Sequence, residues 1–212
     1  MRAKEINTII KEQTEEFFKQ EGFKYVQKSI GYIKNENKCR ISYGFVHYEY
    51  HPEYEYEIVL FVQLTEIEEI YKKIRNGVTV GITYVFPLSY FLDKENYVNN
   101  NPEWNIEYKK DIPPFSKALT DTYTKYVKEF IPFITQPQNM LNFLLSEIAT
   151  GKDYANDENV FARVLILMKL LNYPMEELQA KLAEFKSKLA NYREDIKQTY
   201  YTQMDNIVSG NW

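Results

Sequence analysis

The sequence predicts an α+β protein built in three parts. These are an N-terminal helix, an antiparallel or mixed sheet of about four or five strands with an inserted helix, and an all-helical C-terminal half of about four helices. Strand-like segments rich in Tyr, Val, Ile and Phe occupy the first half of the 212-residue chain, and helical spacing begins after Pro113-Pro114. Strands followed by helices argue against a doubly wound parallel sheet. We expect residues 1–112 to form a sheet region and residues 113–212 a helical region packed on it as one compact unit.

The first half begins with an amphipathic helix, which Gly22 is placed to end. Thr65 and Glu68 form a capping box, in which the Thr side chain accepts from the Glu amide and the Glu side chain reaches back. This box starts the inserted helix, which ends at Asn76-Gly77. Strands are expected over residues 23–29, 41–64, 78–92 and 104–110.

The second half is expected to contain four helices. The first two span about residues 116–130, where Pro132 stops the helix, and 136–150. The third begins near Asp157 and is apolar nearly all round, so we expect it at the centre of the core. The fourth runs from Pro174 to about residue 200 and carries apolar residues at spacings of 3 and 4: Met175, Leu178, Leu182, Phe185, Leu189, Tyr192 and Ile196. This seam packs against helices of the same chain or, alternatively, makes a homo-oligomer through the 174–200 helix.

Composition and charge narrow the classes of function. The net charge is −4, and residues 41–71 hold seven Glu and no Asp, Lys or Arg. A field of that sign repels nucleic acid and attracts a basic protein partner. The single cysteine, Cys39, cannot form an internal disulfide, and the chain begins without an apolar signal core. We therefore expect a cytoplasmic protein of a bacterium or phage, with no membrane segment and no cofactor.

The stretch HYEYHPEYEYE, residues 47–57, concentrates the aromatic and acidic residues of this segment. Alternating strand residues point to opposite faces of a sheet. A turn centred on Pro52 would pair Tyr48 with Tyr56 and His47 with Glu57, so that the tip has a tyrosine face and an acidic face. The predicted binding surface consists of Tyr48, Glu49, Tyr50, Tyr54, Glu55, Tyr56 and Glu57.

A metal site in this stretch is not favoured. His47 and His51 lie about 13 Å apart along an extended strand, too far for one ion to bridge. The candidate ligands are therefore His47 with Glu57, and a hydrogen-bonded His–Glu pair explains the same two residues.

A catalytic alternative uses Asp93, Glu107 and Lys109. An Asp followed after a gap by Glu-x-Lys resembles the restriction-endonuclease-like nucleases. That resemblance implies a Mg²⁺-dependent nuclease or phosphodiesterase, in which the two carboxylates hold the ion and the lysine assists the attacking water. A third alternative is a small-ligand-binding protein with a tyrosine-lined pocket between the sheet and the helical half.

The sequence favours a non-enzymatic interaction protein that binds a basic partner through the acidic, tyrosine-rich hairpin. Two His and one Cys leave little for nucleophilic catalysis. In general type, a small α+β chain with an acidic, aromatic surface resembles the immunity proteins of toxin systems, which implies an immunity-protein-like or regulatory role.

Overall fold

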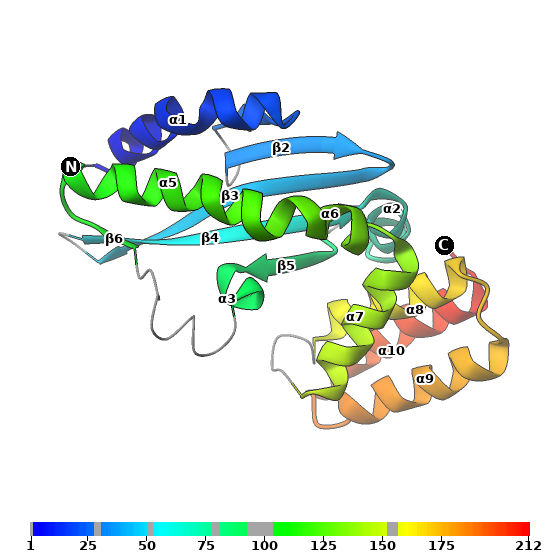
Figure 1. Ribbon diagram of the computed structural model, residues 1–212. Coiled ribbons are helices and arrows are strands. Elements are labelled where there is room, and N and C mark those ends of the chain that lie inside the picture. The colour runs from blue at the N-terminus through cyan, green and yellow to red at the C-terminus, as the bar shows by residue number, and fades with distance from the viewer. Residues whose placement is uncertain (1, 28–30, 51–52, 78–80, 93–103, 152–156) are drawn as a thin grey trace. The chain divides into compact units, whose positions relative to one another are not determined.

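A computed structural model describes residues 2–27, 31–50, 53–77, 81–92, 104–151 and 157–212 (Figure 1). The predicted α+β class is confirmed. An N-terminal helix precedes an antiparallel sheet, one helix is inserted between strands, and helices make up the C-terminal half.

The sheet has six strands among the described residues, in the order β1-β2-β3-β4-β5. Its described strand pairs are antiparallel, and β6 pairs with β4 beyond the end of β5. The strands are β1 (Lys24–Val26), β2 (Gly31–Glu36), β3 (Cys39–Tyr50), β4 (Glu53–Leu64), β5 (Tyr84–Pro87) and β6 (Trp104–Ile106). Strands β3 and β4 are the longest, and they form the hairpin that the sequence predicts over residues 41–64.

The chain divides into two compact units. We call Met1–Gln63 with Tyr84–Pro132 the sheet unit, and Leu64–Thr83 with Phe133–Trp212 the helical unit. The segment inserted between β4 and β5 therefore belongs to the helical unit, although its sequence neighbours are strands.

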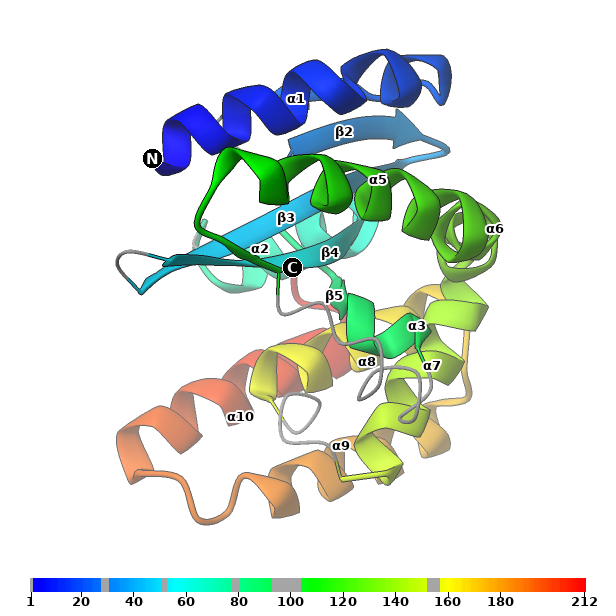
Figure 2. The same cartoon turned by 60° about the vertical axis from the view of Figure 1, so that its left-hand side comes forward.

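In the sheet unit, α1 (Ala3–Gln20) and α5 (Ile112–Thr122) cover the same face of the sheet (Figures 1 and 2). Phe18 of α1 stacks on Tyr32 of β2 with a centroid distance of 4.2 Å, and the Tyr43 hydroxyl of β3 donates to the Leu119 carbonyl of α5 at 2.8 Å. Aromatic residues thus fill the space between the helices and the sheet. We call this the helix-covered face.

The helix of α5 continues through a π-helical turn, η2 (Tyr123–Val127), into α6 (Lys128–Ile134). Pro132 lies inside α6, so the prediction that it stops the helix is wrong. The proline removes one backbone N–H donor from the helix, and the helix ends two residues later at Ile134. A short helix, α3 (Leu88–Phe91), follows β5, and a 3₁₀ turn, η1 (Lys109–Asp111), precedes α5.

The helical unit consists of α2 (Thr65–Ile74), α7 (Pro137–Ala149), α8 (Glu158–Leu170), α9 (Met175–Lys188) and α10 (Glu194–Ser209). Every residue from Val160 to Met168 of α8 is buried, and α8 contacts all four other helices. The prediction of a central apolar helix is confirmed for this unit. The Asp157 side chain caps α8 by accepting from the Asn159 amide.

The predicted single helix over residues 174–200 is wrong, because the structure has two helices there. α9 ends at Lys188 and α10 begins at Glu194. Glu194 and Asp195 occupy the first turn of α10, where acidic residues stabilise a helix N-terminus. The apolar residues keep their spacing of 3 and 4 across the segment between α9 and α10. Periodicity alone therefore does not reveal that the helix is interrupted.

No helix in the described ranges is both long enough and apolar enough to cross a membrane.

Candidate functional site

The tip of the β3–β4 hairpin separates its four tyrosines into two pairs. Tyr48 and Tyr50 are 47% and 65% exposed, whereas Tyr54 and Tyr56 are 5% and 1% exposed. The predicted surface therefore retains two of its four aromatic residues.

Tyr54 and Tyr56 are buried because they belong to the core beneath α1 and α5. The Tyr56 hydroxyl donates to the Asn7 side chain of α1 at 2.8 Å, and its ring lies 5.3 Å from that of Phe115 in α5. On the outer side of β4, Ile106 pairs with Tyr54 in the antiparallel register of β6. Burial raises the pKa of the Tyr56 hydroxyl, so this residue acts as a neutral core side chain.

His47 identifies which residues share a face. Its ring stacks on Tyr56 at 5.4 Å with an interplanar angle of 22°, and it lies 6.4 Å from the Tyr54 ring. Its Nε2 is 4.0 Å from Glu49 Oε1. His47 and Glu49 therefore point to the helix-covered face, together with Tyr54 and Tyr56.

The predicted register of the hairpin is wrong by one residue. That register placed His47 opposite Glu57, but the imidazole stacks on Tyr56, and neighbouring strand residues point to opposite faces. β3 ends at Tyr50 and β4 begins at Glu53, which leaves two residues between them. The prediction assumed three, and an odd instead of an even number reverses the faces of one strand relative to the other.

The corrected register brings aromatic and acidic residues together on one face. Since His47, Tyr54 and Tyr56 point to the helices, the alternate residues Tyr48, Tyr50, Glu55 and Glu57 point to the opposite side of the hairpin. We call these four residues the mixed face. The expected separation into a tyrosine face and an acidic face does not occur.

The mixed face is electrostatically unfavourable when it is empty. Partial burial and then the neighbouring Glu55 raise the pKa of Glu57. The whole segment of residues 41–71 supplies no Lys or Arg to offset these charges. A cation placed between the two carboxylates would relieve their repulsion.

The structure does not bring His47 and Glu57 together as metal ligands, because they lie on opposite faces of the hairpin. Within the described ranges, no group of three or more His, Cys, Asp or Glu side chains could hold a metal ion. His51 and Pro52 lie outside these residues.

Asp93 also lies outside the described residues. The predicted strand over 104–110 ends at Ile106, and Lys109 begins the 3₁₀ turn η1. Asp111 accepts from the backbone amides of Glu107 and Tyr108, which turns the chain at this point. Glu107 and Lys109 therefore do not share a strand face, as the nuclease pattern requires.

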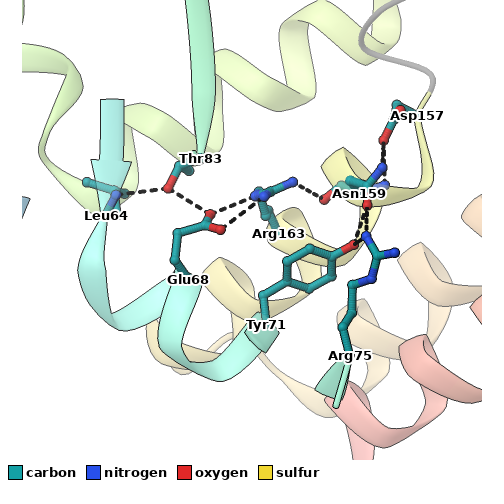
Figure 3. A network of polar contacts seen from close by, with 8 residues as sticks. All are labelled: Leu64, Glu68, Tyr71, Arg75, Thr83, Asp157, Asn159 and Arg163. Atoms are coloured by element: carbon teal, nitrogen blue, oxygen red, sulfur yellow. Dashed lines mark hydrogen bonds and ion pairs between the residues drawn. The ribbon is translucent and has the colours of Figure 1, made fainter. Parts of the chain in front are cut away.

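A polar network inside the helical unit was not predicted from the sequence (Figure 3). Glu68 of α2 forms a two-pronged ion pair with Arg163 of α8, with Nε–Oε1 and Nη2–Oε2 distances of 2.7 and 3.0 Å. The side chains of Arg163 and Glu68 are 5% and 3% exposed. The guanidinium also lies over the Tyr71 ring, with its Cζ 4.6 Å from the ring centroid.

The network reaches both ends of the inserted segment (Figure 3). The Thr83 hydroxyl donates to Glu68 at 3.0 Å and accepts from the Leu64 amide at 2.8 Å. On the other side, the Asn159 side chain accepts from Arg75 at 2.8 Å. Each of these polar groups has a partner within the unit, so the arrangement fastens the segment Leu64–Thr83 to α8 and leaves no reactive group open to a ligand.

The network corrects the predicted capping box. α2 begins at Thr65 without a side-chain cap, and the Glu68 carboxylate binds Arg163 instead. The two charged residues are 95 positions apart in the sequence. The one signal in the sequence was the single Arg in the otherwise apolar run of α8, which needs a buried partner.

Comparison with models of protein families, with curated proteins and with solved structures finds no match to this chain.

Proposed function

We propose that this chain is a non-enzymatic interaction protein that binds a basic protein partner through the mixed face of its hairpin. One observation carries the proposal: two exposed tyrosines and two glutamates share one strand face. It supports the role predicted from sequence while reducing the contact surface to Tyr48, Tyr50, Glu55 and Glu57.

The residue types on this face suit protein binding. Tyrosine offers a large contact area with only two side-chain torsions to fix, and it is enriched at interfaces. Carboxylates beside it steer a basic partner and exclude acidic ones. Exposed ion pairs contribute only about 0.2–1 kcal/mol each, so the tyrosines would supply most of the affinity and the glutamates most of the selectivity.

The remaining candidate nucleophile supports a non-enzymatic role. Cys39 is buried, and its thiol lies 3.5 Å from the Asn37 carbonyl. Burial, followed by the charge of Glu36, raises the pKa of the Cys39 thiol and so disfavours the reactive thiolate. A small protein that covers a basic surface of another protein fits an immunity-protein-like or regulatory role.

The test compares charge reversals at two places on the chain. The partner is isolated from the source cell, purified, and titrated calorimetrically at several salt concentrations. We expect Glu55→Lys/Glu57→Lys to weaken binding at least tenfold, which is about 1.4 kcal/mol, and to flatten its salt dependence. The control Glu66→Lys/Glu69→Lys alters the net charge equally at two exposed positions of α2. Unchanged binding by the hairpin variant, or equal weakening by the control, would reject the proposal.

A further inference from the structure

We infer that the mixed face recognises alternate arginines, Arg-x-Arg, in an extended segment of the partner. This inference rests on the proposed function and specifies the chemistry that the hairpin reads. Three features support it: the spacing of the four side chains, their charge, and an arginine site inside the chain.

The spacing on the hairpin matches an extended peptide. Tyr48 and Tyr50 are two residues apart on β3, and Glu55 and Glu57 are two apart on β4. Two residues of a strand span about 6.6 Å, and neighbouring strands lie about 4.8 Å apart. Side chains i and i+2 of an extended ligand have the same separation and also point the same way. Since His47 lies opposite Tyr56, Tyr48 lies opposite Glu55, and Tyr50–Glu55 and Tyr48–Glu57 are successive diagonal pairs across the two strands. Each of two alternate arginines can therefore meet a tyrosine ring from β3 and the diagonal carboxylate from β4.

The negative charge of the mixed face favours one cation beside Glu55 and another beside Glu57. Glu55 and Glu57 point in one direction from β4, in the segment that lacks Lys and Arg. Their mutual repulsion contributes to the raised pKa of Glu57. Two cations on the ligand would neutralise both carboxylates, whereas one would leave a net negative charge on the face.

Inside the helical unit, the chain already binds one guanidinium group with a tyrosine ring and a carboxylate. Arg163 places its Cζ 4.6 Å from the Tyr71 ring centroid while two of its nitrogens donate to Glu68. A planar fork can make the two-pronged carboxylate contact and stack on a ring at once, which an ammonium group cannot. The mixed face presents the same two partners, a tyrosine ring and a carboxylate, on adjacent strands. We therefore expect it to prefer arginine over lysine.

The experiment uses four labelled peptides, blocked at both ends, with serine at every position not named. Their basic pairs are Arg-x-Arg, adjacent Arg-Arg, Arg-x-x-Arg and Lys-x-Lys, so the first three have identical composition. Fluorescence anisotropy with the full chain at physiological salt is expected to show Arg-x-Arg binding at least threefold tighter than each of the other three. The chain is titrated into each labelled peptide up to about 1 mM protein, so that dissociation constants up to the millimolar range are measured.

Matched variants link the preference to the mixed face. Glu55→Gln/Glu57→Gln and Tyr48→Leu/Tyr50→Leu should each abolish the discrimination. Glu66→Gln/Glu69→Gln on α2 and Tyr108→Leu, at a tyrosine that is 54% exposed, should preserve it. Thermal melts verify that every variant is folded.

Two results separate this inference from the proposed function. Equal affinity for the four peptides, or no binding that depends on the mixed face up to the highest concentration, overturns the inference even where the natural partner still requires Glu55 and Glu57. Natural-partner binding that ignores Glu55 and Glu57 overturns the proposed function and the inference together.

Discussion

The buried pair of Glu68 and Arg163 is held by contacts on every side of both charged groups. Removing two charges from water is costly, and the pair is favourable only when both groups keep their hydrogen bonds. Here the carboxylate receives two guanidinium nitrogens and the Thr83 hydroxyl. Removing one member leaves the other buried without its counter-charge.

We therefore predict that Arg163→Met lowers the free energy of unfolding by about 3–5 kcal/mol. The double variant Arg163→Met/Glu68→Leu should recover most of this loss, because no isolated charge then remains in the interior. Urea unfolding of the wild type, both single variants and the double variant measures the coupling between the two positions. A single-variant loss below about 1 kcal/mol, in the range of exposed pairs, would show that the charges are not buried as described.

Glu57 provides the pH dependence of the hairpin. Its pKa is raised in the folded chain, so folding favours the protonated carboxyl and the charged form destabilises the protein. The destabilisation is absent below the unfolded pKa and complete above the folded pKa. We expect Glu57→Gln to increase the free energy of unfolding at pH 7 by a few tenths of a kcal/mol, and so to raise the melting temperature slightly, since the group is partly exposed and screened.

The difference between wild type and Glu57→Gln should vanish near pH 3.5, which is below the ordinary glutamate pKa of about 4.3. Melting curves of both proteins across this range test the prediction. A wild type more stable than the variant at pH 7 would mean that a cationic group already satisfies Glu57. Binding of a basic partner should release a proton from Glu57 over the same range, because a nearby cation lowers its pKa.

At the scale of elements, α9 and α10 show where the apolar seam of the sequence lies in space. Leu178, Leu182, Phe185 and Leu189 are all at most 5% exposed within a single chain. The Phe185 ring stacks on Phe161 of α8 at 4.3 Å, and the Tyr201 hydroxyl of α10 donates to the Lys186 carbonyl of α9. This part of the seam is therefore used for packing inside the helical unit.

Leu182→Ala is expected to lower the free energy of unfolding by about 2–5 kcal/mol without changing the oligomeric state. Chemical unfolding gives the first quantity, and sedimentation velocity over a range of protein concentrations gives the second. A change of sedimentation coefficient in folded Leu182→Ala protein would instead support the alternative of a homo-oligomer through residues 174–200.

The fold class and most elements could be predicted from the sequence, because the period of the apolar residues in a long segment distinguishes a helix from a strand. The shorter strands were harder. β2, which the sequence does not predict, includes the polar residues Lys34, Asn35 and Glu36, and these pair with β3 in the structure. Strand pairing there overrides a weak local preference. The strand predicted over residues 104–110 is too long. The Asp111 carboxylate accepts from the backbone amides of residues 107 and 108, and this turns the chain after Ile106.

The hairpin was located correctly along the chain, but the composition of each of its faces depended on one unknown. Whether two or three residues separate β3 from β4 decides which tyrosines face the core, and a proline with flanking Tyr and His allows either. Tyr54 and Tyr56 also owe their burial to α1, α5 and β6, which are distant in the sequence. Periodicity predicts that alternate residues share a face, but which face is covered follows only from tertiary packing.

At the scale of the whole molecule, the two units do not follow the order of the sequence. The segment Leu64–Thr83 leaves the sheet unit after β4 and joins the helical unit before β5 begins. Its connection to α8 runs through Glu68 and Arg163, a pair that no local pattern reveals. The sequence predicts a sheet region over residues 1–112 and a helical region over residues 113–212, packed on it as one compact unit, and this packing stays a prediction.

We predict that α2 opens together with the helical unit. Phe161 is fully buried in α8, and Phe161→Ala should lower the free energy of unfolding by about 3–5 kcal/mol. Hydrogen exchange followed by mass spectrometry should show faster exchange in α2 along with α8 and α10. Exchange of α2 that stays in step with β4 and β5 would contradict the assignment of this segment to the helical unit.

The alternation of side chains on the hairpin limits how its length can change during evolution. Deleting one residue of β4 between Glu57 and the buried base of the strand would turn Glu55 and Glu57 toward the space beneath α5 and carry the rings of Tyr54 and Tyr56 to the outside. Deleting or adding two residues would shorten or extend the projection and keep each remaining side chain on its present side. Descendants of this chain should therefore differ in hairpin length by even numbers of residues on each strand.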